Sequence, residues 1–310
     1  MFFGTKKDNS VKWEHKDISQ LDLCKVNAVV FGGTSGIGRA ISHQLADRGA
    51  NVLVVGRHFK DEDMKKIKFL HADLSLITEA DRIANEIPAK DITHMIFTTG
   101  IVAAPQREQT PEGIERDMAV SYLSRYMLIR ELAGKMGKGL PHNASKPRIF
   151  IMGFPGSGQL GDPENLNSDK KKYNALSTHS NTVAANEALV LDSKDRYKNV
   201  EVFGLNPGII KTEIRNNYLG KDSIFSKAVE WVVGWTCQTP EDYAKNICPL
   251  LVSPDLDNKS GTMFDNKGNA ILQSAGLAPE VVHNFIHNSA VLVTKVLAMK
   301  PNETTSKLPV

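Results

Sequence analysis

The chain has 310 residues, of which 41% are hydrophobic, and its formal net charge is +3 at pH 7. Hydrophobic residues are numerous enough for a large core, and the lack of a sustained basic stripe argues against a nucleic-acid partner. The three cysteines are far apart and show no metal-ligand spacing, so we expect no metal site and a reducing, cytoplasmic compartment. We expect neither a signal peptide nor a membrane span, because apolar runs are too short for either.

The first strand signal, 27–31, leads into a glycine-rich turn and then a helical pattern. The glycines have the spacing G-x-x-x-G-x-G. A turn from a strand into a helix presents free N–H groups and the positive end of the helix dipole to phosphate, and glycines let the backbone approach a pyrophosphate closely. The motif predicts a dinucleotide site formed by Gly32, Thr34, Ser35, Gly36, Ile37 and Gly38.

The segment GGTSGIGRA resembles the cofactor loop of the short-chain dehydrogenase/reductase family, usually T-G-x-x-x-G-I-G, with Phe31 in place of the threonine. Matches to family patterns run from about Asn27 to Phe264, and several local segments resemble divergent fungal aldehyde reductases. Together with alternating strand and helix signals, this predicts an α/β fold: a single Rossmann-type, doubly wound parallel sheet with helices on both faces. We expect it over residues 26–275, between an N-terminal extension over 1–25 and a C-terminal helix and tail over 276–310.

The second strand, 51–55, ends where a dinucleotide site reads the adenosine ribose. An acidic residue there would bind the 2′-hydroxyl of NAD, but this chain has Gly56 and Arg57. An arginine can pair with a 2′-phosphate, so the sequence favours NADPH, with NADH as the alternative. Arg57 could instead be a solvated loop charge, since acidic residues follow it at 61–63.

Two further pairs are assigned to the cofactor by resemblance. Asp73 and Leu74 match the family's D-[VL] pair, although Asp73 also suits a helix cap near residue 76. Thr99 and Gly100 follow the fourth strand, 95–98, where the family has N-N-A-G.

The residues Thr110 and Pro111 predict the start of a long helix, with the hydroxyl as N-cap and proline in the first turn. Within it, Ser121 stands where the family has its catalytic asparagine. The fifth strand, 148–152, leads in the family to a serine that binds the substrate carbonyl, but this chain has Phe154 there. Ser157 could supply the hydroxyl, or it could be an ordinary loop serine.

Tyr173 is predicted to open the next helix and matches the tyrosine of the family's Y-x-x-x-K signature. In the family, this tyrosine exchanges a proton with the substrate oxygen, and the lysine lowers its pKa. Here Ser177 replaces the lysine, so we expect Tyr173 to stay neutral. A neutral phenol suits carbonyl reduction better than alcohol oxidation.

The sixth strand, 200–205, is followed by a match to the family's N-x-P-G-x-x-x-T turn, which covers the nicotinamide. Its predicted cofactor residues are Pro207, Gly208, Ile210 and Thr212. Residues 213–236 are apolar and are expected to form the substrate lid. The resemblance also implies homodimers that pair through the helices that follow Ser121 and Tyr173.

The function predicted is an NAD(P)H-dependent carbonyl reductase that acts on small aldehydes, in which Tyr173 donates the proton and Ser121, Ser157 and Ser177 are auxiliary candidates. The family's lysine, serine and asparagine are all replaced, which motivates an alternative of another class. That alternative is a catalytically inactive dinucleotide-binding or redox-sensing protein.

Overall fold

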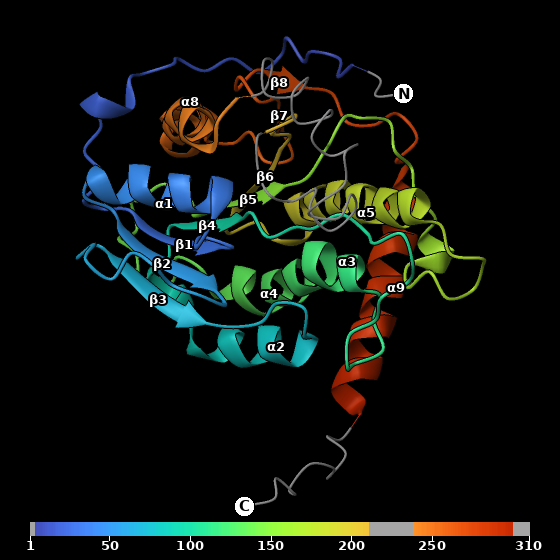
Figure 1. Cartoon of the computed structure of the whole chain (residues 1–310). Helices are drawn as coiled ribbons and strands as arrows, with labels where there is room; N and C mark the ends of the chain where they lie inside the picture. Colours follow the sequence, from blue (N-terminus) through green and yellow to red (C-terminus); the bar gives the residue numbers. More distant parts are fainter. Residues whose placement is uncertain (1–3, 211–237, 300–310) are drawn as a thin grey trace, which may run out of the picture.

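The structure, a computed structural model, describes residues 4–210 and 238–299. In this part of the chain, eight strands form one sheet in the order β3-β2-β1-β4-β5-β6-β7-β8 (Figure 1). Strands β1 to β7 are parallel to their neighbours, and β8 pairs with β7 in the antiparallel direction. The strands are β1 (Asn27–Phe31), β2 (Asn51–Gly56), β3 (Ile67–His71), β4 (His94–Phe97), β5 (Arg148–Met152), β6 (Glu201–Leu205), β7 (Met263–Phe264) and β8 (Ala270–Ile271).

Helices cover both faces of the sheet, which confirms the predicted fold class (Figure 1). On one face, α1 (Gly36–Asp47) packs against α8 (Pro240–Val252). The other face carries α2 (Ile77–Glu86), α4 (Ser124–Leu132), α5 (Ala175–Arg196) and α9 (Pro279–Ala298). Short helical turns occupy Ile18–Gln20, Ala89–Asp91, Ala133–Lys135, Pro163–Asn165 and Pro254–Leu256.

Strand β1 lies between two hydrophobic cores and contributes alternate side chains to each, as a strand with two buried faces must. Val29 and Phe31 belong to the core under α2, α4, α5 and α9. Ala28 and Val30 belong to the core under α1 and α8. The centre of the sheet is therefore buried on both faces, and ligand sites are expected in the loops beyond the carboxyl ends of its strands.

The helix expected at Pro111 begins later, so that prediction is wrong. Residues 111–113 form a turn, and α3 (Arg116–Met118) follows it. The side chain of Glu115 accepts a hydrogen bond from the Met118 amide and caps α3. A π-helical turn, η3 (Ala119–Leu123), then joins α3 to α4.

The next helix also begins later than predicted, because α5 starts at Ala175 and not at Tyr173. Asn174 is the N-cap, and its side chain accepts from the Ser177 amide at 3.0 Å. Tyr173 therefore lies outside the helix. It does not have the one-turn helical spacing to Ser177 that the family signature implies.

The two ends of the described chain pack on the sheet domain. Near the N-terminus, Lys7 forms an antiparallel bridge with Ile271, and Trp13 Nε1 donates to Gly268 O at 2.7 Å. At the other end, α9 packs against α5 and runs across it (Figure 1), and Ser289 hydrogen-bonds Tyr122 at 2.7 Å. Any homodimer built on α4 and α5 would have to form around α9.

No helix among the described residues is both long and apolar enough to cross a membrane. The predicted lid, 213–236, and Thr212 lie outside the described residues.

Candidate functional site

The glycine turn after β1 has a backbone that only glycine accommodates at its critical positions. Gly32 has a φ of +85°, and a Cβ built there would lie 2.8 Å from Thr99 N. A Cβ on Gly38 would overlap Gly32 O and Thr98 Oγ1. The turn and the end of β4 therefore meet backbone to backbone, and they leave the first amides of α1 facing outward.

The other residues predicted for this turn lie around the N-terminus of α1. Thr34 packs against Gly56 at the end of β2, Ser35 precedes the first residue of α1, and Ile37 lies against the core. Gly100 is half-buried beside Thr99, whose Oγ1 is buried without a hydrogen-bond partner among the described residues. A helix N-terminus, a glycine cradle and an unpaired buried hydroxyl fit the phosphates and ribose of a dinucleotide.

The exposed cation Arg57 directly follows β2. The nearby Asp61 is 4% exposed and is neutralised by Arg39, whose Nε lies 3.0 Å from both carboxylate oxygens. His43 Nε2 lies 3.1 Å from the same carboxylate. Hydrogen bonds from Arg39 hold the pKa of Asp61 below its usual value, although burial opposes this shift. One of the acids that weakened the interpretation of Arg57 is thus already paired.

The residues predicted after β3 have a structural role in the described chain. Asp73 accepts a hydrogen bond from the Ser75 amide at 3.0 Å, and Leu74 is buried in the core. Asp73 does not cap α2 itself. Glu112 does so from a distant loop, because its carboxylate accepts from the amides of Ile77 at 2.6 Å and Thr78 at 3.0 Å.

The turn after β6 is ordered by its asparagine. Asn206 accepts from the Gly208 amide and donates to Pro155 O, each at 3.0 Å. This links the turn to the loop after β5. Pro207 and Ile210 are buried, and Gly208 has a φ of +66°.

Tyr173 lies beside the segment that follows Gly100. Its hydroxyl donates to Ala104 O at 2.9 Å. Burial raises the pKa of Tyr173 to about 12, and the negative charges of Glu115 and Asp117 add to the effect. The phenol is therefore neutral at physiological pH, as the missing lysine predicted.

The three auxiliary serines lie in different surroundings. Ser121 is buried, and its Oγ accepts from the Ile101 amide at 3.0 Å, next to Gly100. The Oγ of Ser157 is buried and has no partner among the described residues. Ser177 is exposed on the first turn of α5. Ser121 thus lies at the predicted site, whereas Ser177 does not occupy the polar interior that a substitute for the lysine would need.

Sequence reasoning missed the polar residues that join α3 to α5. Asp117, which is fully buried, lies 2.7 Å from His179 Nδ1 and accepts from Ser121 Oγ at 2.5 Å. Further along, Arg125 is 3% exposed and donates to Met152 O, Thr99 O and Asn186 Oδ1. A signal was present in the sequence, since Asp117, Ser121 and Arg125 repeat at helical spacing inside an otherwise apolar segment.

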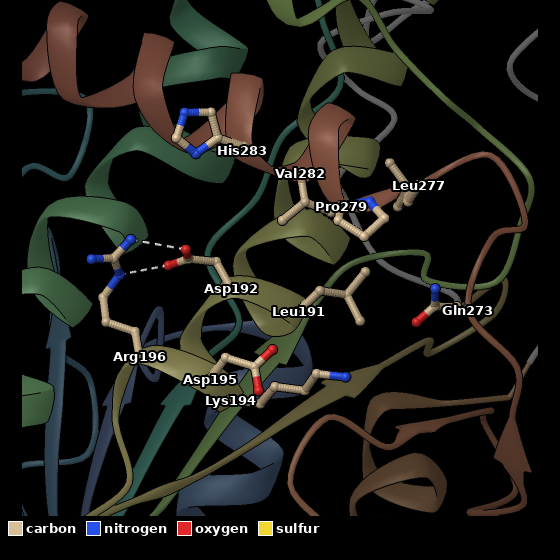
Figure 2. A pocket seen from close by; sticks show the side chains of 10 residues that line it. All are labelled: Leu191, Asp192, Lys194, Asp195, Arg196, Gln273, Leu277, Pro279, Val282 and His283. Atoms are coloured by element: carbon tan, nitrogen blue, oxygen red, sulfur yellow. Dashed lines mark hydrogen bonds and ion pairs between the residues drawn. The ribbon is translucent and has the colours of Figure 1, made fainter.

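The described residues line two cavities, and only the smaller one lies beside the candidate site. A small one, of about 40 Å³, is lined by Ile101, Val102, Ala104, Glu108, Glu115, Arg116 and Asp117. A larger one, of about 520 Å³, lies between the last turns of α5 and the start of α9 (Figure 2). Its residue Leu191 is about 24 Å along α5 from Ala175, at a rise of roughly 1.5 Å per residue. The larger cavity is therefore not part of the candidate site.

The parallel sheet, the glycine cradle and the nearby neutral phenol define a dinucleotide-binding α/β protein of oxidoreductase type. The sequence profile described as short chain dehydrogenase matches residues 26–143. An uncharacterized oxidoreductase of Saccharomyces cerevisiae is 55% identical over 304 residues, which cover 97% of this chain and 98% of that protein. The chain belongs to the short-chain dehydrogenase family, whose members generally bind NAD(P)(H).

More distant relatives share the fold. Human polyprenol dehydrogenase is 24% identical over 262 residues, covering 77% of this chain and 76% of the relative. A solved structure of an uncharacterized protein from Mycobacterium paratuberculosis has a TM-score of 0.64 at 16% identity, covering 91% of this chain and 98% of that one. The solved structure of aldohexose dehydrogenase from Thermoplasma acidophilum has a TM-score of 0.59 at 18% identity, covering 83% of this chain and 97% of that one.

Proposed function

We propose that this oxidoreductase is an NADPH-preferring carbonyl reductase that acts on aldehydes. The observation that carries the proposal is the position of the Tyr173 hydroxyl, which contacts Ala104 O four residues after Gly100. A neutral proton donor is thereby held next to the predicted cofactor segment. When bound, the nicotinamide supplies the hydride.

The chain's own contribution is a proton and a position for the substrate. An acid with a pKa of about 12 holds its proton at neutral pH and can donate it to an oxygen that becomes negatively charged during reduction. The same high pKa makes the phenolate scarce, so alcohol oxidation should be slow. Among carbonyl compounds, a reactive aldehyde needs the least acid catalysis, so its reduction suits a site whose proton donor is a weak acid.

The preference for NADPH rests on Arg57. It is exposed at the end of β2, and Asp61 nearby is already paired with Arg39. A 2′-phosphate could therefore pair with this cation, since Asp61, one of the acids that follow it in the sequence, is already neutralised. Free thiols at Cys24 and Cys248 accord with the cytoplasmic location that we propose.

The aldehyde panel that tests this function should include apolar as well as small compounds. One curated relative is named polyprenol dehydrogenase, and others are named retinol dehydrogenase. Short aliphatic, aromatic and isoprenoid aldehydes should therefore be assayed side by side, by following NADPH and NADH absorbance.

The decisive comparison is between wild type and Tyr173→Phe, with Tyr197→Phe at the other end of α5 as the matched control. We expect turnover in wild type and in Tyr197→Phe, and a loss of about 10²- to 10⁴-fold in Tyr173→Phe. Full activity of Tyr173→Phe would refute its role as the proton donor. A wild type that binds both cofactors but oxidises neither with any aldehyde would refute the reductase.

That last outcome would favour the second candidate, a catalytically inactive dinucleotide-binding or redox-sensing protein. Its specific support is that Phe154 occupies the position of the family's serine and Ser177 is exposed. A partner whose binding changed with the NADPH/NADP ratio would support this alternative.

A further inference from the structure

A row of polar side chains joins the helical segment α3–η3–α4 to α5. Asp117, Ser121 and Arg125 are spaced by four residues on the first segment, and His179 and Asn186 face them from α5. Asn186 Nδ2 donates to Ser121 O at 2.8 Å, which closes the row between its two ends. In Figure 1, α3 and the start of α5 lie side by side beyond the strands. The His179 end of the row is therefore at the edge where ligands bind in such folds.

The Asp117–His179 contact has the geometry of an orienting pair. Asp117 is fully buried, so its carboxylate must be satisfied by partners, and His179 and Ser121 supply them. The 2.7 Å contact to Nδ1 assigns the ring proton to that nitrogen. Nε2 is then the atom that can exchange a proton with a ligand. The His179 side chain is 27% exposed, so the pair has both a buried and an accessible end.

We propose that His179, oriented by Asp117, is the acid–base group that returns a proton to Tyr173 after the phenol has protonated the substrate oxygen. The inference rests on the proposed carbonyl reduction. As the carbonyl carbon is reduced, its π electrons move to oxygen, the phenolic O–H bond of Tyr173 breaks, and the substrate O–H bond forms. The phenolate then receives the Nε2 proton of the imidazolium through solvent, so the Nε2–H bond breaks and the phenolic O–H bond forms again. The neutral ring then takes a proton from water. Asp117 acts as a positioning residue.

Electrostatics support this assignment. Burial alone would lower the pKa of His179, but the hydrogen bond to Asp117 and the charges of Asp117 and Glu115 outweigh it, and the net pKa is raised. A larger protonated fraction near neutral pH suits an acid in reduction. The titratable groups that face His179 in the described chain are Asp117 and, less closely, Glu115.

The small cavity lies beside a contact residue of each proton donor. It is lined by Ala104, whose carbonyl accepts from Tyr173, and by Asp117, which contacts His179. The two donors differ in acidity. The weaker acid is the phenol, whose pKa is about 12, and the stronger is the imidazolium.

The first arm of the test needs no substrate. In ¹⁵N-detected NMR of the unliganded protein, we expect His179 to carry its neutral-state proton on Nδ1 and to have a pKa above the usual value for histidine. Asp117→Asn should lower the pKa of His179. If the pKa of His179 is at or below the usual value, or if Asp117→Asn has no effect on it, the proposal is overturned.

The second arm measures carbonyl reduction against pH. We expect His179→Gln to lose about 10²- to 10⁴-fold in kcat with unchanged affinity for NADPH, and to lose the alkaline limb of the profile. Asp117→Asn should move that limb to lower pH, and His287→Gln is the control. Wild-type turnover retained in His179→Gln would overturn this proposal while the reductase stands. No wild-type turnover would overturn the proposed function and this step together.

Discussion

The glycine turn after β1 and the polar contact between α3 and α5 are built in opposite ways. In the glycine turn, the determinants are backbone conformations and missing side chains within seven residues, 32–38. In the α3–α5 contact, the determinants are side chains that lie 62 residues apart, such as Asp117 and His179. A local pattern encodes the first almost completely. The second exists only once two helices have been placed against each other.

The difference also affects the chemistry of each region. Glycines and free amides bind any suitably placed phosphate, so the turn specifies a cofactor class. Buried acids and a histidine set proton affinities, so the α3–α5 contact specifies a reaction. Changes in the first region should remove binding, whereas changes in the second should alter pH dependence.

The largest effect is expected from Gly38→Val. The new side chain would overlap Gly32 O and Thr98 Oγ1, and both are held by the central sheet. Overpacking of this kind costs about 1–3 kcal/mol in stability and displaces the first turn of α1. We expect NADPH binding, measured by fluorescence titration, to be undetectable. Gly134→Ala is the control, because nothing lies within 4 Å of a Cβ there, and normal binding by Gly38→Val would show that the cradle is not the site.

The next effect concerns stability and pH at Glu115, which is 1% exposed. Burial raises its pKa to about 7, above the value in the unfolded chain, so its contribution to stability is largest at low pH. That contribution is lost as pH rises from about 4.5 to about 7 and amounts to at most about 3 kcal/mol.

The free energy of unfolding in urea should therefore change less between pH 5 and pH 7 in Glu115→Gln than in wild type, because glutamine does not titrate. Glutamine also keeps a carbonyl that can accept from the Met118 amide. Glu187 has a raised pKa as well, but it is present in both proteins and cancels. Glu131→Gln, on the partly exposed side of α4, should match wild type. If the free energy of unfolding changed equally between pH 5 and pH 7 in all three proteins, the raised pKa of Glu115 would be contradicted.

The effect on cofactor choice should be smaller. Arg57→Asp removes a charge-assisted hydrogen bond worth about 1.5–3 kcal/mol, so we expect affinity for NADPH to fall roughly 10- to 100-fold and the preference to move toward NADH. Lys90→Asp makes the same change in net charge at an exposed position before β4 and should leave the preference unchanged. A wild type that prefers NADH would refute the role of Arg57.

The strands were predicted from the sequence more accurately than the starts of the helices. The five strands whose bounds were predicted above, at 27–31, 51–55, 95–98, 148–152 and 200–205, were found with ends within one residue, because a strand buried on both faces needs a continuous apolar run. Helix starts were less predictable. Thr110 and Asn174 are both good capping types, but only Asn174 caps a helix, since Glu115 provides the cap for α3.

The candidate site was predictable at positions where the backbone conformation allows only one residue type. Gly32 and Gly38 have backbone constraints that can be read from spacing. Tyr173 was placed near the site by resemblance, but its position before α5 was not foreseen. The Asp117–His179 contact was missed because His179 is not unusual in its own segment, and only the packing of α3 on α5 brings it to Asp117.

The smallest effect tests a cap that crosses between segments. The sequence offered Asp73 as the cap of α2, whereas the structure uses Glu112, whose carboxylate accepts from two amides and from Thr78 Oγ1 at 2.6 Å. A cap is worth about 1 kcal/mol, and a carboxylate also interacts favourably with the helix dipole. Glu112→Ala should therefore lower the free energy of unfolding by about 1 kcal/mol, and Asp73→Ala by less. The reverse order in urea unfolding would mean that the local residue, as the sequence suggested, is the one that stabilises α2.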